Sequence, residues 1–154
     1  MSEEEVAKFL AGFSRRISEI DRLATAVLKA HFLVEEFLDR ALAAAAKSPK
    51  HLELERNPRF AQKMKWLRAF APLGDDSRWE LVSALNNLRN KVAHKVDGPE
   101  RKEALQKLRK ELAPHVKKEL SVLNEQRWPD YNIVLAAAME SNLFLTQVRT
   151  EVGK

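Results

Sequence analysis

The sequence predicts an all-α fold, a single-domain helical bundle of five to seven helices spanning residues 1–154. Apolar residues recur at spacings of three and four rather than in the alternation typical of strands. The 4 Gly and 6 Pro fall almost entirely at expected helix boundaries. At 154 residues, with 45% hydrophobic and 32% charged residues, the chain is long enough to bury one core.

The first two expected helices occupy residues 2–12 and 14–47. Ser2 and Glu5 have the spacing of a capping box, which opens a short helix that is expected to end near Gly12. The longer helix carries apolar residues one turn apart, as a buried helix face requires. These residues are Ile17, Ile20, Leu23, Val27, Leu28, Val34, Leu38, Ala41 and Leu42.

Four further helices are expected, over residues 58–71, 77–95, 99–128 and 131–149. Asn57 and Pro58 are a typical N-cap and first-turn proline for the first of them. Ser77 with Glu80 repeats the capping-box spacing at the second. Pro114 is expected to interrupt the third.

Composition excludes several kinds of site. The chain has no Cys, which excludes disulfides, thiolate metal ligands and a Cys nucleophile. The opening residues MSEEE lack the basic start and apolar core of a signal peptide, and the apolar stretch 131–148 contains too many polar residues for a membrane span. We therefore expect a cytoplasmic protein with no membrane partner.

The net charge of +5 is unevenly distributed. Residues 47–74 hold 7 basic and 2 acidic residues, and residues 99–127 hold 8 and 5. A basic patch attracts RNA or DNA through counterion release, although a solvated helix face explains the same charges.

The candidate functional residues lie in the expected helix 77–95. At about 100° per residue, the apolar side chains form one core stripe and polar side chains form the opposite face. The stripe contains Leu81, Leu85, Leu88 and Val92, and the polar face contains Ser83, Asn87, Asn90 and His94. Asn90 and His94 are one turn apart, whereas Arg89 lies about 140° around the helix from His94. Two copies related by a two-fold axis would bring Arg and His into one cleft.

These residue types suit phosphodiester cleavage. Histidine exchanges protons near neutral pH, so it can activate a ribose 2′-hydroxyl or protonate a leaving oxygen. Arginine stabilises charge that develops on phosphoryl oxygens, and asparagine can orient the imidazole or bind phosphate. Such a scheme requires no metal or cofactor. It spares DNA, which has no 2′-hydroxyl.

The segment Arg89-Asn90-Lys91-Val92-Ala93-His94 resembles the Arg-X4–6-His motif of the HEPN superfamily. The helix with AVLKAHFLVEEFLDRAL, residues 26–42, is similar to the first core helix of that family. The resemblance covers about residues 15–96, a HEPN-like core, with about 99–150 as additional helices. The mannitol-repressor-like branch has a similar helix pair.

The resemblance implies a homodimeric, metal-independent endoribonuclease whose two motifs share one cleft. Arg89, Asn90 and His94 are then the catalytic residues and RNA the partner. Many such proteins are toxins of toxin–antitoxin pairs or phage-defence effectors, which implies an antitoxin or regulatory partner. Toxins silenced by nucleotidyl modification carry a Tyr where this chain has Val96. The alternative that the resemblance implies is a non-catalytic regulator or adaptor like the mannitol-repressor-like proteins.

Further basic residues are candidates for RNA binding. Lys91 and Lys95 flank the motif, and Lys63, Lys65 and Arg68 surround Trp66. Core packing competes with base stacking as the role of Trp66, Trp79 and Trp128.

Two structural interpretations concern polar residues of the expected helix 14–47. His31 is expected to be a satisfied core or interface histidine. Glu35, Glu36, Asp39 and Arg40 are expected to form helix-surface pairs rather than catalytic carboxylates. No metal ligand set is expected, because neither His51 nor His115 has a partner at ligand spacing.

Overall fold

The computed structural model describes residues 2–18, 21–52, 58–94, 98–116 and 128–154, with the backbone alone for residues 15–18 and 94. These residues form six α-helices, two short 3₁₀ turns and no strand, so the all-α prediction is confirmed. The α-helices are α1 (Glu3–Ser18), α2 (Arg22–Ala45), α3 (Phe60–Phe70), α4 (Arg78–His94), α5 (Pro99–Leu112) and α7 (Asp130–Val152). The 3₁₀ turns are η1 (Pro49–Leu52) and η3 (Ala113–His115).

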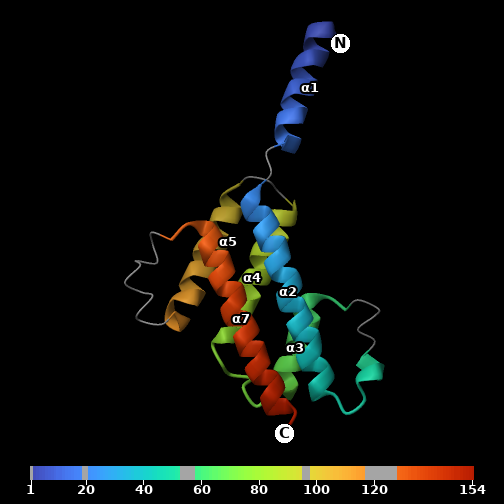
Figure 1. Ribbon diagram of the computed structural model, residues 1–154, viewed down its shortest axis with the longest axis vertical. Coiled ribbons are helices and arrows are strands. Elements are labelled where there is room, and N and C mark those ends of the chain that lie inside the picture. The colour runs from blue at the N-terminus through green and yellow to red at the C-terminus, as the bar shows by residue number, and fades with distance from the viewer. Residues whose placement is uncertain (1, 19–20, 53–57, 95–97, 117–127) are drawn as a thin grey trace.

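The bundle is organised around the long helices α2, α4 and α7. In Figure 1, α2 and α7 run side by side, with α3 at the lower end of α2, while α1 projects away from the bundle at its upper end. Helix α4 packs against α2, α5 and α7. The predicted core stripe is confirmed, because Leu81, Leu85, Leu88 and Val92 are all buried. None of the helices in the described part of the chain is both long and apolar enough to cross a membrane.

The first helix boundary differs from the prediction. The capping box forms as expected, since the Ser2 backbone N–H donates to Glu5 Oε2 at 2.7 Å and the Glu5 N–H donates to Ser2 Oγ at 3.3 Å. Helix α1 nevertheless continues through Gly12 to Ser18, and the expected helix 14–47 is two helices. A single glycine costs a helix interior only about 1 kcal/mol, so it need not end the helix.

A capping aspartate marks the true start of α2. Asp21 Oδ1 accepts the Ala24 N–H at 2.9 Å, and the Asp21 carboxylate also binds the Arg101 guanidinium, with Nη2 at 2.9 Å from Oδ1. The hydrogen bond from Arg101 is the main reason that the pKa of Asp21 lies below its usual value. This residue therefore fixes the N-terminus of α2 and joins it to α5.

The central helices begin close to the predicted positions with different caps. Helix α3 starts after Arg59, and Asn57 lies outside the described residues. At α4 the capping oxygen comes from Asp76, whose Oδ1 accepts the Arg78 N–H at 2.9 Å, so the prediction that the cap is Ser77 needs this correction. Asp76 also binds the Arg78 guanidinium, which is the main cause of its lowered pKa.

The three tryptophans pack in or against the core, as the core-packing interpretation predicts. Trp79 is fully buried, donates its indole N–H to the Leu73 carbonyl at 2.8 Å and meets the Phe144 ring edge-on at 4.9 Å. Trp66 and Trp128 are half-buried and pack against the core. Helix α5 ends at Leu112 and Pro114 lies in η3, which confirms the expected interruption. The expected continuation of this helix over residues 117–127 lies outside the described residues.

Candidate functional site

A polar groove with a volume of about 720 Å³ lies where α2, the start of α3 and α4 meet. Helix α4 contributes Asn86, Arg89 and Asn90 to its lining, and α2 contributes His31 and Glu35. The remaining lining residues are Pro58, Arg59, Phe60 and Ala61. Two of the three predicted catalytic residues, Arg89 and Asn90, therefore border one groove.

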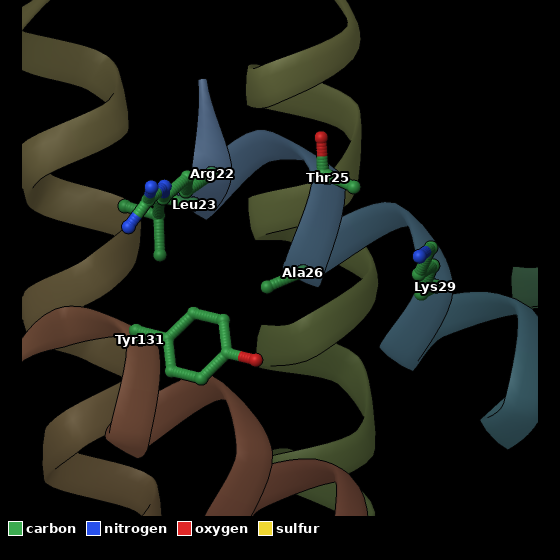
Figure 2. Close-up of a pocket in the computed structure, with 6 residues that line it drawn as sticks. All are labelled: Arg22, Leu23, Thr25, Ala26, Lys29 and Tyr131. Carbon is green, nitrogen blue, oxygen red and sulfur yellow. The ribbon is translucent and has the colours of Figure 1, made fainter. Parts of the chain in front are cut away.

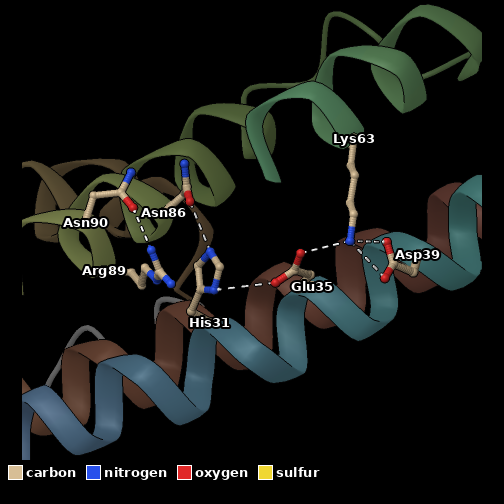
Figure 3. A network of polar contacts seen from close by, with 7 residues as sticks. All are labelled: His31, Glu35, Asp39, Lys63, Asn86, Arg89 and Asn90. Atoms are coloured by element: carbon tan, nitrogen blue, oxygen red, sulfur yellow. Dashed lines mark hydrogen bonds and ion pairs between the residues drawn. The ribbon is translucent and has the colours of Figure 1, made fainter. Parts of the chain in front are cut away.

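Arg89 and Asn90 contact each other within this groove. Arg89 Nη1 donates to Asn90 Oδ1 at 3.1 Å, and both side chains are half-buried (Figure 3). His94 is the last residue of α4, and its side chain lies outside the described part of the structure. The predicted relation of Arg89 to His94 therefore stays a prediction.

His31 is a second imidazole at the groove and comes from α2. It is 6% exposed, its Nε2 is 3.0 Å from Asn86 Oδ1, and its ring centroid is 4.5 Å from that of Phe60. Burial lowers the pKa of His31, and it outweighs the hydrogen bond to Asn86 and the nearby Glu35 carboxylate, which favour the charged form. In the neutral ring, Nε2–H donates to Asn86 and Nδ1 is an acceptor. The interpretation of His31 as a satisfied, buried histidine is confirmed, and the residue also lines the groove.

A buried ion cluster adjoins His31 (Figure 3). Lys63 reaches from α3 to α2 and is 2% exposed. Its Nζ is 2.8 Å from Glu35 Oε1 and 2.9 Å from Asp39 Oδ1, while Glu35 Oε2 is 4.0 Å from His31 Nδ1. Burial alone would lower the pKa of Lys63, but the hydrogen bonds to Glu35 and Asp39 outweigh it and the pKa is raised.

Two sequence interpretations are corrected by this cluster. The Lys63 ammonium is enclosed by protein carboxylates, so this lysine is not placed to contact an RNA phosphate. Glu35 and Asp39 bind across to α3 rather than pairing along the surface of α2. Glu36 and Arg40 do form the expected pair one turn apart.

Three other predicted RNA-binding residues do not line the groove, namely Lys65, Arg68 and Lys91. Lys65 is exposed on α3, and Lys91 Nζ is 3.8 Å from Glu100 Oε2. Arg68 donates from Nε to the Gly74 carbonyl at 2.6 Å. Lys95 lies outside the described residues.

Sequence reasoning assigned no role in the site to Asn86 or Arg59. Asn86 lies one turn before Asn90 and extends the polar face toward the core stripe. This spacing is the signal by which the sequence could have identified it. Arg59 was counted as basic charge alone. Its place beside the groove depends on how α3 packs against α2, and helix periodicity does not specify that packing.

Comparisons of the chain with protein-family models, curated proteins and solved structures found no match. Among the residues that the structure describes, no group of three or more His, Asp or Glu is arranged to hold a metal ion.

Proposed function

We propose that this chain is a HEPN-type endoribonuclease that cuts RNA by metal-independent attack of the 2′-hydroxyl in a homodimer. The observation that carries the proposal is the groove, in which Arg89 and Asn90 of the motif helix lie together with a second arginine, Arg59, and with His31. Two guanidinium groups at one groove suit a phosphodiester, because arginine binds phosphate through paired N–H donors.

The reaction follows from the chemistry of the motif. His94 takes the proton of a ribose 2′-hydroxyl, and the 2′-oxygen forms a bond to phosphorus while the bond from phosphorus to the 5′-oxygen breaks. The leaving 5′-oxygen takes a proton from the protonated histidine or from water, so the products are a 2′,3′-cyclic phosphate and a 5′-hydroxyl. Arg89 stabilises the charge on the nonbridging oxygens, and Asn90 positions the Arg89 guanidinium through their hydrogen bond.

The test is an RNase assay with EDTA on structured and single-stranded RNA. We expect cleavage by the wild type and a decrease of about 10²-fold or more in Arg89→Ala and His94→Ala, as is usual for loss of a charge stabiliser or an acid–base group. Arg149→Ala is the matched control, because this exposed arginine on α7 lies outside the groove and should leave the rate unchanged. Circular dichroism verifies the fold of each variant. Failure of the wild type to cut any RNA in the panel, or full activity in both motif variants, contradicts the proposal.

A second candidate function is that of a non-catalytic regulator or adaptor. The large apolar side chains exposed on α2 and α7 favour it, because such patches mark protein contacts. This candidate predicts no RNA cleavage and partner binding that persists in His94→Ala. Growth inhibition on overexpression that His94→Ala relieves would instead support the ribonuclease.

A further inference from the structure

Helices α2 and α7 both expose large apolar side chains. On α7 these recur every fourth residue, and on α2 they lie within two turns. This α2/α7 apolar face consists of Leu28, Phe32, Leu33, Tyr131, Leu135, Met139 and Leu143, each between 44% and 69% exposed. The two helices pack side by side (Figure 1), and one depression is lined by Tyr131 of α7 together with Leu23 and Ala26 of α2. A patch of this extent indicates a surface that another apolar surface covers.

The α2/α7 apolar face is hollowed in two places. A depression of about 570 Å³ lies over Leu23, Ala26 and Tyr131, with Arg22 and Lys29 at its edge (Figure 2). A second depression of about 430 Å³ lies over Leu28, Lys29, Phe32 and Leu33. Concave apolar surface of this kind receives the projecting side chains of a partner helix.

Helix α1 carries a complementary apolar side. Phe9, Leu10 and Phe13 are between 54% and 63% exposed, and the rings of Phe9 and Phe13 lie 6.1 Å apart. The helix stands away from the bundle (Figure 1). Because an isolated helix of this length is marginal in water, α1 gains stability by burying these side chains.

We propose that in a homodimer α1 of each copy packs on the α2/α7 apolar face of the other copy. Charge gives the direction of packing. The first turn of α1 is acidic, with Glu3, Glu4 and Glu5. Arg22 and Lys29, which are basic, border the depression over Leu23, Ala26 and Tyr131. An α1 that runs in the same direction as α2 brings these opposite charges together.

The same charges disfavour packing of α1 on its own chain. A fold-back across the short connection of residues 19–21 runs α1 antiparallel to α2. This direction would carry the acidic first turn away from Arg22, which lies at the start of α2. Packing on a second copy instead keeps the acidic first turn beside Arg22 and Lys29, and reciprocal exchange makes a pair.

The available area matches that of a stable dimer. At about 100 Å² for each half-exposed apolar side chain, covering these ten side chains on both copies removes about 2,000 Å² at most. Standard protein interfaces bury about 1,200–2,000 Å², so partial cover of the face is sufficient. This inference concerns assembly alone and does not depend on RNA cleavage.

Cysteine cross-linking tests the exchange, because the 154-residue chain has no Cys of its own. Two differently tagged copies of the 154-residue chain are co-expressed, one carrying Phe13→Cys and the other Met139→Cys, and treated with a short bismaleimide. We expect a product of twice the chain mass that carries both tags, and each variant alone should remain at the mass of one chain. Phe70→Cys replaces Met139→Cys as the control, because Phe70 is similarly exposed but lies on α3, outside the α2/α7 apolar face.

Three outcomes overturn the proposal. Cross-linking of Met139→Cys to itself would show that two α2/α7 faces meet directly. A link that forms only when both cysteines are in one chain, at the mass of one chain, would show that α1 folds onto its own bundle. No link with this pair, nor with Phe9→Cys and Leu135→Cys, would show that α1 is not on this face.

Discussion

His31 combines a titratable ring with almost complete burial. Its Nε2 donates to Asn86 and its Nδ1 faces Glu35 at 4.0 Å, so the ring couples α2 to α4 at the edge of the groove. Because burial disfavours the charged imidazolium, the pKa of His31 is lower in the folded protein than the ordinary value of 6.5. The folded state therefore holds a neutral ring at neutral pH.

This lowered pKa predicts that acid destabilises the protein through His31. Above pH 6.5 the ring is neutral in both states, and the residue adds no pH dependence. As the pH falls below 6.5, the unfolded chain binds a proton that the folded ring resists, so the free energy of unfolding decreases until the lowered pKa is reached. Urea unfolding at about pH 7.5 and about pH 5.5 should show a larger loss in wild type than in His31→Gln. His51→Gln is the control, because His51 is exposed and its variant should lose as much as wild type. An equal loss in His31→Gln and wild type contradicts the prediction.

At the scale of elements, residue spacing within a helix correctly predicted the features that depend on that helix alone. The buried stripe of α4 and the capping box at Ser2 follow from spacings within one helix, and both formed as expected. The break between α1 and α2 was misplaced because Gly12 is a weaker signal than the cap at Asp21, whose second partner, Arg101, is 80 residues away. Local patterns likewise identified only the groove residues that lie on α4.

The groove residues on α4 belong to one helix face, whereas those from α2 and α3 do not follow from any local pattern. Arg89 and Asn90 were identified by their spacing within the motif. The ion cluster joins residues 24 and 28 positions apart, and it depends on where α3 packs. Lys63 was expected to be a surface cation, but it is buried and joins α3 to α2.

We predict that Lys63 contributes to stability by holding α3 against α2. Lys63→Met leaves Glu35 and Asp39 partly buried without their shared cation. Removing one member of a buried ion pair costs about 3–5 kcal/mol, and the partial exposure of both carboxylates reduces the expected cost to about 2–3 kcal/mol. Urea unfolding at neutral pH measures the change. Lys65→Met is the matched control with an expected change near zero, because Lys65 is exposed on the same helix. Equal stabilities of the two variants would refute this role.

At the scale of the whole molecule, α2 serves two surfaces. Part of its surface carries His31 and Glu35 toward the groove, and the adjoining exposed part carries Leu28, Phe32 and Leu33 in the α2/α7 apolar face. His31 and Phe32 are consecutive residues, so a helix docked on the apolar face lies next to the groove. Helix α2 therefore carries residues of both the candidate site and the proposed dimer interface.

If two copies exchange α1, unfolding includes dissociation and depends on protein concentration. Each tenfold increase in concentration then stabilises the folded dimer by about 1.4 kcal/mol, which raises the melting temperature by about 2 °C for two chains of this size. Scanning calorimetry over a hundredfold range of concentration measures this shift. Met139→Glu and Phe13→Glu place a carboxylate in the buried interface from either side, so each should make the melting temperature independent of concentration. Phe70→Glu should keep the wild-type dependence, because Phe70 lies outside the face. A wild-type melting temperature that is constant across the range would mean that the chain unfolds as a monomer, and the exposed α2/α7 face would then have a different occupant.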